Sequence, residues 1–246
     1  MLIAYLDCFS GVSGDMLLGA IIDSGLDEGK WLSELAKLNL HAFDVEITRT
    51  VRNGISGTKV DIKLSNEDTS HGRHLSNIVD IINASQFSEI VKSRITAVFT
   101  RLAAAEARIH ATSPESIHFH EVGAVDAIAD ISGACIGFEM LGIQQLYVSE
   151  LPFTRGWVDC AHGRIPVPTP ATLALLNGFC WRHDPRPMEL ITPTGAAIVA
   201  EFTERTEEGY AAPCPRMRLK STGYGAGNRQ TEIPNLLRLC IGEAIE

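Results

Sequence analysis

The first 25 residues contain a strand pattern, a glycine-rich loop and a helix pattern in immediate succession. Residues 2–7 (LIAYLD) are an apolar run that ends in an aspartate, as a buried strand does. The loop CFSGVSG follows, and the next residues, DMLLGAIIDSG, have the apolar spacing of a helix. A strand that passes directly into a helix in this way indicates a chain of the α/β class.

The remaining patterns extend this prediction along the chain. Hydrophobicity alternates on both sides of Arg52-Asn53-Gly54, which predicts a β-hairpin over 43–64. Apolar spacing and breakers predict helices over about 31–40, 75–84, 88–112 and 123–142, one from 169, and a strand-to-helix turn at 189–204. Short strands are expected around 145–151 and 157–160. We therefore predict an α/β fold with a mixed or mostly parallel sheet flanked by helices, from which the hairpin is an excursion.

The domain prediction separates two parts of the chain. Residues 1–204 are expected to form the α/β domain. Residues 205–246 are charged, then proline-rich, and end in two strand patterns around the glycine-rich segment GYGAG (223–227), which we interpret as a hairpin turn. We read this second part as a linker and β segment that leads toward an absent C-terminal domain.

Composition excludes several classes of protein. The formal net charge of −9 leaves no basic footprint for nucleic acid. No apolar run reaches the roughly 18 residues of a membrane span, and the N-terminus lacks the basic region of a signal peptide, so we expect a cytoplasmic protein. The six cysteines contain no C-x-x-C pair, which argues against a zinc ribbon or a disulfide framework.

The segment HFHEVGAVDAIAD (118–130) concentrates polar groups before an apolar helix pattern. In an extended segment, His118 and His120 would lie on one side, and nearby carboxylates could complete a transition-metal site. The candidate metal ligands are His118, His120, Glu121 and Asp126, with Asp130 on the same helix face as Asp126. The alternative is that the carboxylates cap a helix and the histidines only form hydrogen bonds; the two interpretations stay open.

The first loop is a candidate binding site for an anion. Its backbone N–H groups lie beside an expected helix N-terminus, although it is neither a Walker A nor a dinucleotide-binding loop. Asp7 and Asp15 could instead bind a cation or position a substrate. The candidate residues are Asp7, Ser10, Gly11, Ser13, Gly14 and Asp15. An ordinary tight turn between strand and helix is the alternative.

A third candidate is the stretch TRGWVDCAHGRIPVPTPAT, in which mixed charges stand on stiff backbone, as in a binding loop. Cys160 and His162 could hold a soft metal, and Arg155 and Arg164 could hold a phosphate or carboxylate. A purely structural extended loop is the alternative. In TPTGAAI (192–198), Thr194 is a candidate N-cap and anion contact.

These blocks, in this order, resemble the LarC family, the nickel-insertion proteins of nickel-pincer cofactor biosynthesis. The resemblance is carried by DCFSGVSGDMLLGA, HFHEVGAVDAIADI, CAHGRIPVPTPAT and TPTGAA, and it extends over nearly the whole chain. It implies insertion of Ni²⁺ into pyridinium-3,5-bisthiocarboxylic acid mononucleotide, which gives the cofactor of lactate racemase-type enzymes. It also implies CTP with Mn²⁺ or Mg²⁺ through the C-terminal domain, and as partners that domain or a separate chain, a lactate racemase-type apo-enzyme, and further copies of this chain.

The chain departs from the family pattern in two ways. The histidine-rich run that members often have before the R-H-L-S segment is reduced to His71 and His74, so nickel capture by that loop is not expected. The chain also stops at Glu246, where members continue into a further domain. Two other functions therefore stay open: a metal-dependent phosphoester hydrolase with His120 as general base, and a precursor-binding or interaction module without its own metal site.

Overall fold

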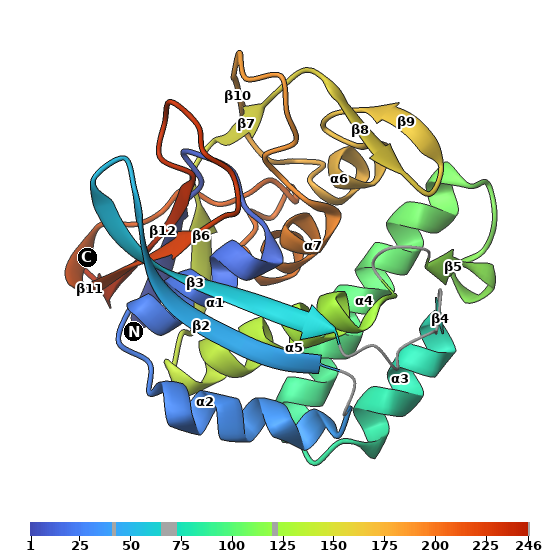
Figure 1. Ribbon diagram of the computed structural model, residues 1–246, viewed down its shortest axis with the longest axis horizontal. Coiled ribbons are helices and arrows are strands. Elements are labelled where there is room, and N and C mark those ends of the chain that lie inside the picture. Colours follow the sequence, from blue (N-terminus) through green and yellow to red (C-terminus); the bar gives the residue numbers. More distant parts are fainter. Residues whose placement is uncertain (41–42, 65–72, 120–122, 246) are drawn as a thin grey trace.

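The computed structural model describes residues 1–40, 43–64, 73–119 and 123–245 (Figure 1). At its centre is a six-stranded sheet in the order β2-β3-β11-β12-β1-β6. These strands are β1 (Leu2–Asp7), β2 (Phe43–Arg52), β3 (Ile55–Leu64), β6 (Gln145–Val148), β11 (Met217–Ala226) and β12 (Leu236–Ala244). Three small two-stranded sheets pair β4 (Arg73–His74) with β5 (His118–Phe119), β7 (Leu151–Phe153) with β10 (Trp181–His183), and β8 (Trp157–Cys160) with β9 (Gly163–Pro166).

The central sheet is mixed. β1 runs parallel to β6, and β3 runs parallel to β11 at the pair Thr58 and Gly225. The other three neighbouring pairs, β2 with β3, β11 with β12 and β12 with β1, are antiparallel. This confirms the mixed form of the predicted α/β fold. It also shows that the predicted hairpin joins the central sheet as its edge.

Seven α-helices are present in the described part of the chain. They are α1 (Gly14–Asp23), α2 (Glu28–Leu35), α3 (Leu75–Ala84), α4 (Glu89–Ile109), α5 (Val125–Met140), α6 (Pro170–Leu175) and α7 (Pro193–Phe202), with short 3₁₀ helices at Ala36–Leu38 and Pro114–Ser116. α1 packs on β11 and β3, and α5 packs behind α1 against α2, α4 and α7. No helix in the part of the chain that the structure describes is long and apolar enough to cross a membrane.

α5 is the centre of the helical layer, and twelve of its sixteen residues are buried. Small residues on α5 let its neighbours approach closely. At Gly133, a Cβ would lie 2.7 Å from a ring atom of Trp31, whose indole N–H donates to the Gly133 carbonyl at 2.9 Å. Trp31 and Phe138 are almost fully inaccessible, and burial of such large side chains is the main favourable contribution to folding.

The glycine-rich segment 223–227 belongs largely to a strand and does not form the predicted hairpin turn. We predicted a hairpin turn there, but Gly223 and Gly225 lie within β11, and the connection to β12 follows at 227–235. The reason is the close approach of α1. A Cβ on Gly225 would lie 1.7 Å from the Met16 carbonyl oxygen, and one on Gly223 would lie 2.1 Å from that of Ala20.

The C-terminal residues contribute two strands, β11 and β12, to the central sheet. We expected residues 205–246 to be a linker and β segment beyond the α/β domain. β12 instead lies between β11 and β1, and its register joins Leu2 to Glu243 and Asp7 to Arg238. The last strands of this chain are therefore central strands of the same sheet that β1 begins.

Candidate functional site

A cavity of about 380 Å³ lies between the C-terminal end of α4, the first turns of α5, α6 and α7, and the β8–β9 hairpin. Figure 1 shows this hairpin beside the end of α4, on the side of the molecule away from the two termini. Residues from sequence positions 106 to 194 line the cavity, whereas most strands of the central sheet come from outside that range. The sheet is therefore a support, and the cavity is built on one side of it.

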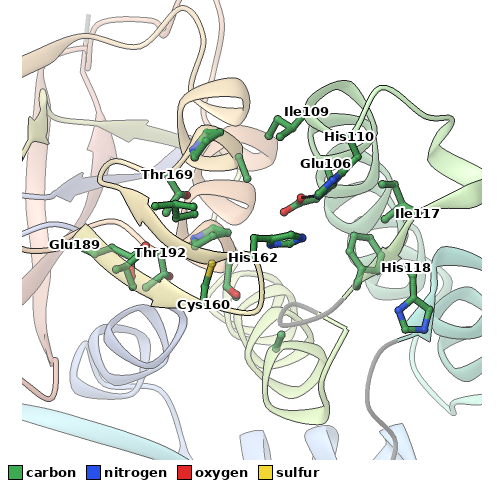
Figure 2. A pocket seen from close by; sticks show the side chains of 18 of the residues that line it. Glu106, Ile109, His110, Ile117, His118, Cys160, His162, Thr169, Glu189 and Thr192 are labelled. Atoms are coloured by element: carbon green, nitrogen blue, oxygen red, sulfur yellow. Dashed lines mark ion pairs between the residues drawn. The ribbon is translucent and has the colours of Figure 1, made fainter. Parts of the chain in front are cut away.

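The β8–β9 hairpin supplies a thiol and an imidazole. Cys160 ends β8, and its Sγ donates to the Gly163 carbonyl at 3.3 Å, which closes the tight turn. Gly163 has a φ of +86°, in the left-handed region that favours glycine. His162, inside the turn, places its ring centroid 4.8 Å from that of His110. Figure 2 shows Cys160 and His162 on the same side of the cavity, with His162 directed toward α4.

α4 supplies the opposite side of this part of the cavity. Glu106 and His110 are four residues apart, so their side chains share one face of the helix end. The Glu106 Oε2 and His110 Nε2 atoms are 3.5 Å apart. A carboxylate on one imidazole nitrogen orients the ring, as it does for many metal-bound histidines. Figure 2 shows both side chains facing His162.

Three threonines form the other end of the cavity lining. Thr169 is the N-cap of α6, where its hydroxyl accepts from Thr172 N at 3.4 Å. Thr192 is the N-cap of α7 and accepts from Gly195 N at 3.2 Å. Our prediction of Thr194 as N-cap is therefore wrong, because Pro193 occupies the first helical position and the cap precedes it. Thr194 nevertheless lines the cavity.

Two carboxyl groups of α5 line the cavity, and their surroundings differ. Asp126 is exposed, and its Oδ1 accepts from Ala127 N at 2.8 Å in the first turn of the helix. Asp130 lies one turn deeper, against Gly14, where an added Cβ would come within 2.1 Å of the Asp130 Oδ2. Its Oδ1 is buried and has no hydrogen-bond partner among the described residues. Burial, with repulsion from Asp15 and other nearby carboxylates, raises the pKa of Asp130 well above its ordinary value.

The first loop does not contribute to this cavity lining. Ser10 is buried and accepts from Arg186 Nη1 at 2.7 Å, and the Phe9 carbonyl accepts from Arg182 Nη2 at 2.7 Å. Gly11 has a φ of +90°, and Gly14 leaves room for Asp130. These contacts account for much of the loop sequence through packing. Whether its remaining N–H groups hold an anion stays a prediction.

The acidic residues that flank the loop have partners within the protein. Asp7 forms an ion pair with Arg238 on the neighbouring strand β12. Asp15 accepts from the Ser13 hydroxyl and, at 2.9 Å, from Met16 N. Burial raises the pKa of Asp15, while these hydrogen bonds oppose the shift. Asp7 therefore belongs to the sheet, and Asp15 to the first turn of α1.

The remaining predicted residues are spread around the site. His118 lines the cavity, and its ring packs edge-on against His74 at a centroid distance of 5.1 Å. Figure 2 places it at the end of the lining away from Thr192. Arg155 and Arg164 are exposed, and the guanidinium of Arg164 lies 6.0 Å from the Trp157 ring centroid.

The candidates His120 and Glu121 lie outside the described residues, as does His71. Among the residues that are described, no three His, Cys, Asp or Glu side chains are already arranged to hold one metal ion. The metal set His118, His120, Glu121 and Asp126 therefore stays a prediction.

The cavity also contains residues that the sequence analysis did not single out, namely Glu106, His110, Thr169, Glu189 and Thr192. Glu106 and His110 stand in an alanine-rich helix pattern, where a carboxylate and an imidazole four residues apart are most often surface residues. Their i, i+4 spacing was the available signal. This pair becomes part of a cavity only because the β8–β9 hairpin, about 50 residues later in the sequence, packs opposite it.

Comparison with known proteins identifies relatives along the whole chain. A family model described as nickel insertion protein matches residues 4–246. The pyridinium-3,5-bisthiocarboxylic acid mononucleotide nickel insertion protein of Desulfitobacterium hafniense (strain DSM 10664 / DCB-2) is 48% identical over 240 residues, which are 98% of this chain and 58% of that protein. The protein of the same name from Geobacillus kaustophilus is 42% identical over 252 residues, 99% of this chain and 60% of that protein. This chain thus spans about three fifths of the length of these curated relatives. No solved structure matches it.

Proposed function

Because the chain belongs to the family of nickel insertion proteins, we propose that it takes part in inserting nickel into pyridinium-3,5-bisthiocarboxylic acid mononucleotide, and that its cavity is where metal and precursor meet. The observation that carries the proposal is the cavity's composition. It combines a thiol and two imidazoles with hydroxyls and helix N-termini in one lining. Such a cavity suits a substrate with one end that binds metal and one phosphorylated end.

Nickel in this proposal is the cargo. Imidazole is a common ligand of Ni²⁺, and a thiolate is a softer one. His162 and His110 are the favoured ligands, because they come from two segments that face each other across the cavity. Cys160 would join them through a rearrangement of the β8–β9 turn, since no three such side chains among the described residues are arranged to hold one ion. Glu106 would orient His110. The predicted set around His118 and Asp126 would act at the outer part of the same cavity.

The phosphate of the precursor would lie at the threonine end. The N-terminus of α7 borders the cavity at this end, and a helix N-terminus favours a negatively charged group. The hydroxyls of Thr192 and Thr194 stand beside the start of α7. We therefore favour this end over the earlier candidates Arg155, Arg164 and the first loop.

The relatives are longer than this chain, so part of the reaction is proposed to depend on more than the described cavity. We include in the proposal the use of CTP with Mn²⁺ or Mg²⁺ by a further C-terminal domain or separate chain. Delivery to a lactate racemase-type apo-enzyme and a homo-oligomeric state belong to it as well.

The test is calorimetric titration of Ni²⁺, and then of the mononucleotide, into chelator-stripped protein. A Cys160→Ser/His162→Ala variant should lose at least tenfold in nickel affinity. The matched control is Cys180→Ser/His183→Ala, which changes the same residue types at exposed positions. A His118→Ala/His120→Ala variant reports on the second predicted set.

Two results would contradict the proposal. The first is equal nickel binding by the wild type and every cavity variant, and the second is the absence of both nickel and mononucleotide binding in a folded wild type. Hydrolysis of simple phosphate esters by the wild type, lost in the cavity variants, would favour the hydrolase instead.

A further inference from the structure

The carboxyl group of Asp130 differs from every other polar group of the cavity in its surroundings. It lines the cavity, and its Oδ1 is buried with no hydrogen-bond partner in the described part of the chain. A buried carboxyl oxygen without a donor normally costs free energy, so a fold rarely retains one without a use. The neighbouring Asp15 is the opposite case, because both the Ser13 hydroxyl and Met16 N donate to it.

The charged groups around Asp130 come from three elements. Asp15 belongs to α1, Asp126 to α5 itself, and Asp61 and Lys59 to β3. The three carboxylates favour protonation of Asp130, and Lys59, which forms an ion pair with Asp61, opposes them. The two carboxyl groups lie in unlike environments: hydrogen bonds from Ser13 and Met16 oppose the rise in the pKa of Asp15, whereas Asp130 has no such donors and its pKa rises well above the ordinary value.

The proposed substrate requires a proton acceptor. This step rests on the proposed function. In a pyridinium ring with thiocarboxylate groups at positions 3 and 5, the two sulfur-bearing groups flank ring carbon 4. A nickel ion held by both sulfurs would be next to the C4–H bond. Nickel can bond to that carbon only when the proton leaves.

We propose that Asp130 is the base that accepts this proton. The C4–H bond breaks, its electron pair forms the carbon–nickel bond, and the proton passes to the Asp130 carboxylate, which becomes a carboxylic acid. Nickel stays Ni²⁺, so the step needs no oxidant or reductant. The Asp15 carboxylate, when ionised, repels negative charge on Asp130 and so increases the basicity of Asp130.

Other acidic residues of the cavity fit this role less well. Asp126 is exposed to water and accepts from the backbone at the start of α5. Glu106 lies beside His110, where it orients the imidazole. Asp159 and Glu189 also line the cavity, and of its five acidic residues Asp130 alone has, in the described part of the chain, a buried oxygen without a hydrogen-bond partner.

The experiment compares single-turnover nickel insertion by the wild type, Asp130→Asn and Glu139→Gln, with Ni²⁺ and the mononucleotide, in the presence of CTP, Mg²⁺ and the C-terminal part of a relative. Glu139→Gln is the matched control, since it makes the same carboxyl-to-amide change on α5, where Glu139 contacts Ser88 and not the cavity. A general base contributes about 10²–10⁴-fold, so Asp130→Asn should slow insertion by at least about 100-fold. Its binding of nickel and mononucleotide should match that of the wild type.

A second variant tests the pair and serves if Asp130→Asn does not fold. Asp15→Asn removes the neighbouring charge and lowers the pKa of Asp130, so the acidic limb of the pH–rate profile should move to lower pH. A purely structural role of either aspartate would leave that limb in place. If the wild type inserts nickel and Asp130→Asn inserts it at the same rate, Asp130 is not the base. The same conclusion follows if the acidic limb of the pH–rate profile does not move in Asp15→Asn. Either result leaves the proposed function intact. A folded wild type that binds neither nickel nor mononucleotide overturns both the base assignment and the proposed function, because no proton would then need an acceptor.

Discussion

At the scale of single residues, Asp130 should lower the stability of the protein that contains it. Its pKa in the folded state lies well above the unfolded value of about 3.9. The sign follows from proton linkage: the native state holds its proton more tightly, so stability falls as pH rises from about 4 through the native pKa. Asp130→Asn should therefore raise the free energy of unfolding by about 1–2 kcal/mol near pH 8 and change it little near pH 4.

Urea denaturation of both proteins at pH 4, 6 and 8 measures this difference, with Glu139→Gln as control. A variant that is more stable and yet impaired in its proposed reaction would show the cost that functional sites impose on a fold. A loss of stability at pH 8 would contradict the charge argument.

At the scale of elements, a short acidic and basic segment holds the first loop in place. Asp184 is buried between Arg182 and Arg186, and Arg186 donates to it from Nε at 2.8 Å and Nη2 at 2.6 Å. Hydrogen bonds from Arg186 lower the pKa of Asp184 to about 2, against an opposing effect of burial. Because the folded pKa is depressed, this stabilisation is present above about pH 4 and is lost as pH falls toward 2.

Asp184→Ala should cost about 3–5 kcal/mol, because it leaves two arginines without the carboxylate that orients them toward Phe9 and Ser10. The measurement is chemical denaturation at pH 7, with the exposed Asp80→Asn as control. Equal losses from both variants would mean that the segment does not secure the loop.

The contact between α1 and β11 gives a second prediction at this scale. Gly225→Ala should destabilise the fold by at least about 2 kcal/mol, since the new methyl group overlaps backbone that cannot move independently. Gly29→Ala is the control in the opposite direction. Its Cβ meets nothing closer than 3.6 Å, and α2 should gain about 0.5–1 kcal/mol. Thermal denaturation followed by circular dichroism distinguishes the two signs, and a neutral Gly225→Ala would contradict the packing argument.

The limits of sequence-based prediction are also clearest for the elements. Local sequence patterns predict these elements well: periodicity predicts α3 and the β2–β3 hairpin, and a long apolar stretch that ends at Gly142 predicts α5. Local patterns do not explain the glycines of β11. These glycines are needed because α1, about 200 residues earlier in the sequence, packs closely against them. The candidate site also combines residues that local sequence identifies with contacts that only tertiary packing creates. Cys160 and His162 were candidates from their local sequence, whereas their meeting with His110 depends on tertiary packing.

At the scale of the whole molecule, ligand binding and folding are linked. A ligand that binds only the folded state at 100 times its Kd adds about 2.7 kcal/mol, which for a chain of this length raises the Tm by about 5–11 °C. Ni²⁺ should produce such a shift in the wild type and a smaller one in Cys160→Ser/His162→Ala, and a chelator should reverse it. Differential scanning calorimetry measures the shift. An equal shift in both proteins would place the metal away from Cys160 and His162.

The pairing of β1 with β12 has a topological consequence. Ala244 N donates to the Met1 carbonyl at 3.1 Å, so the two ends of this polypeptide already meet. A short peptide could join them into a ring, and the ring could be reopened at Asn53-Gly54, the tip of the β2–β3 hairpin. Such a circularly permuted chain should keep its far-ultraviolet spectrum and its nickel affinity, because every lining residue of the cavity lies on the uninterrupted stretch from 106 to 194. The order of the sheet strands along the chain would then differ, while the ligands bound by the cavity would stay the same.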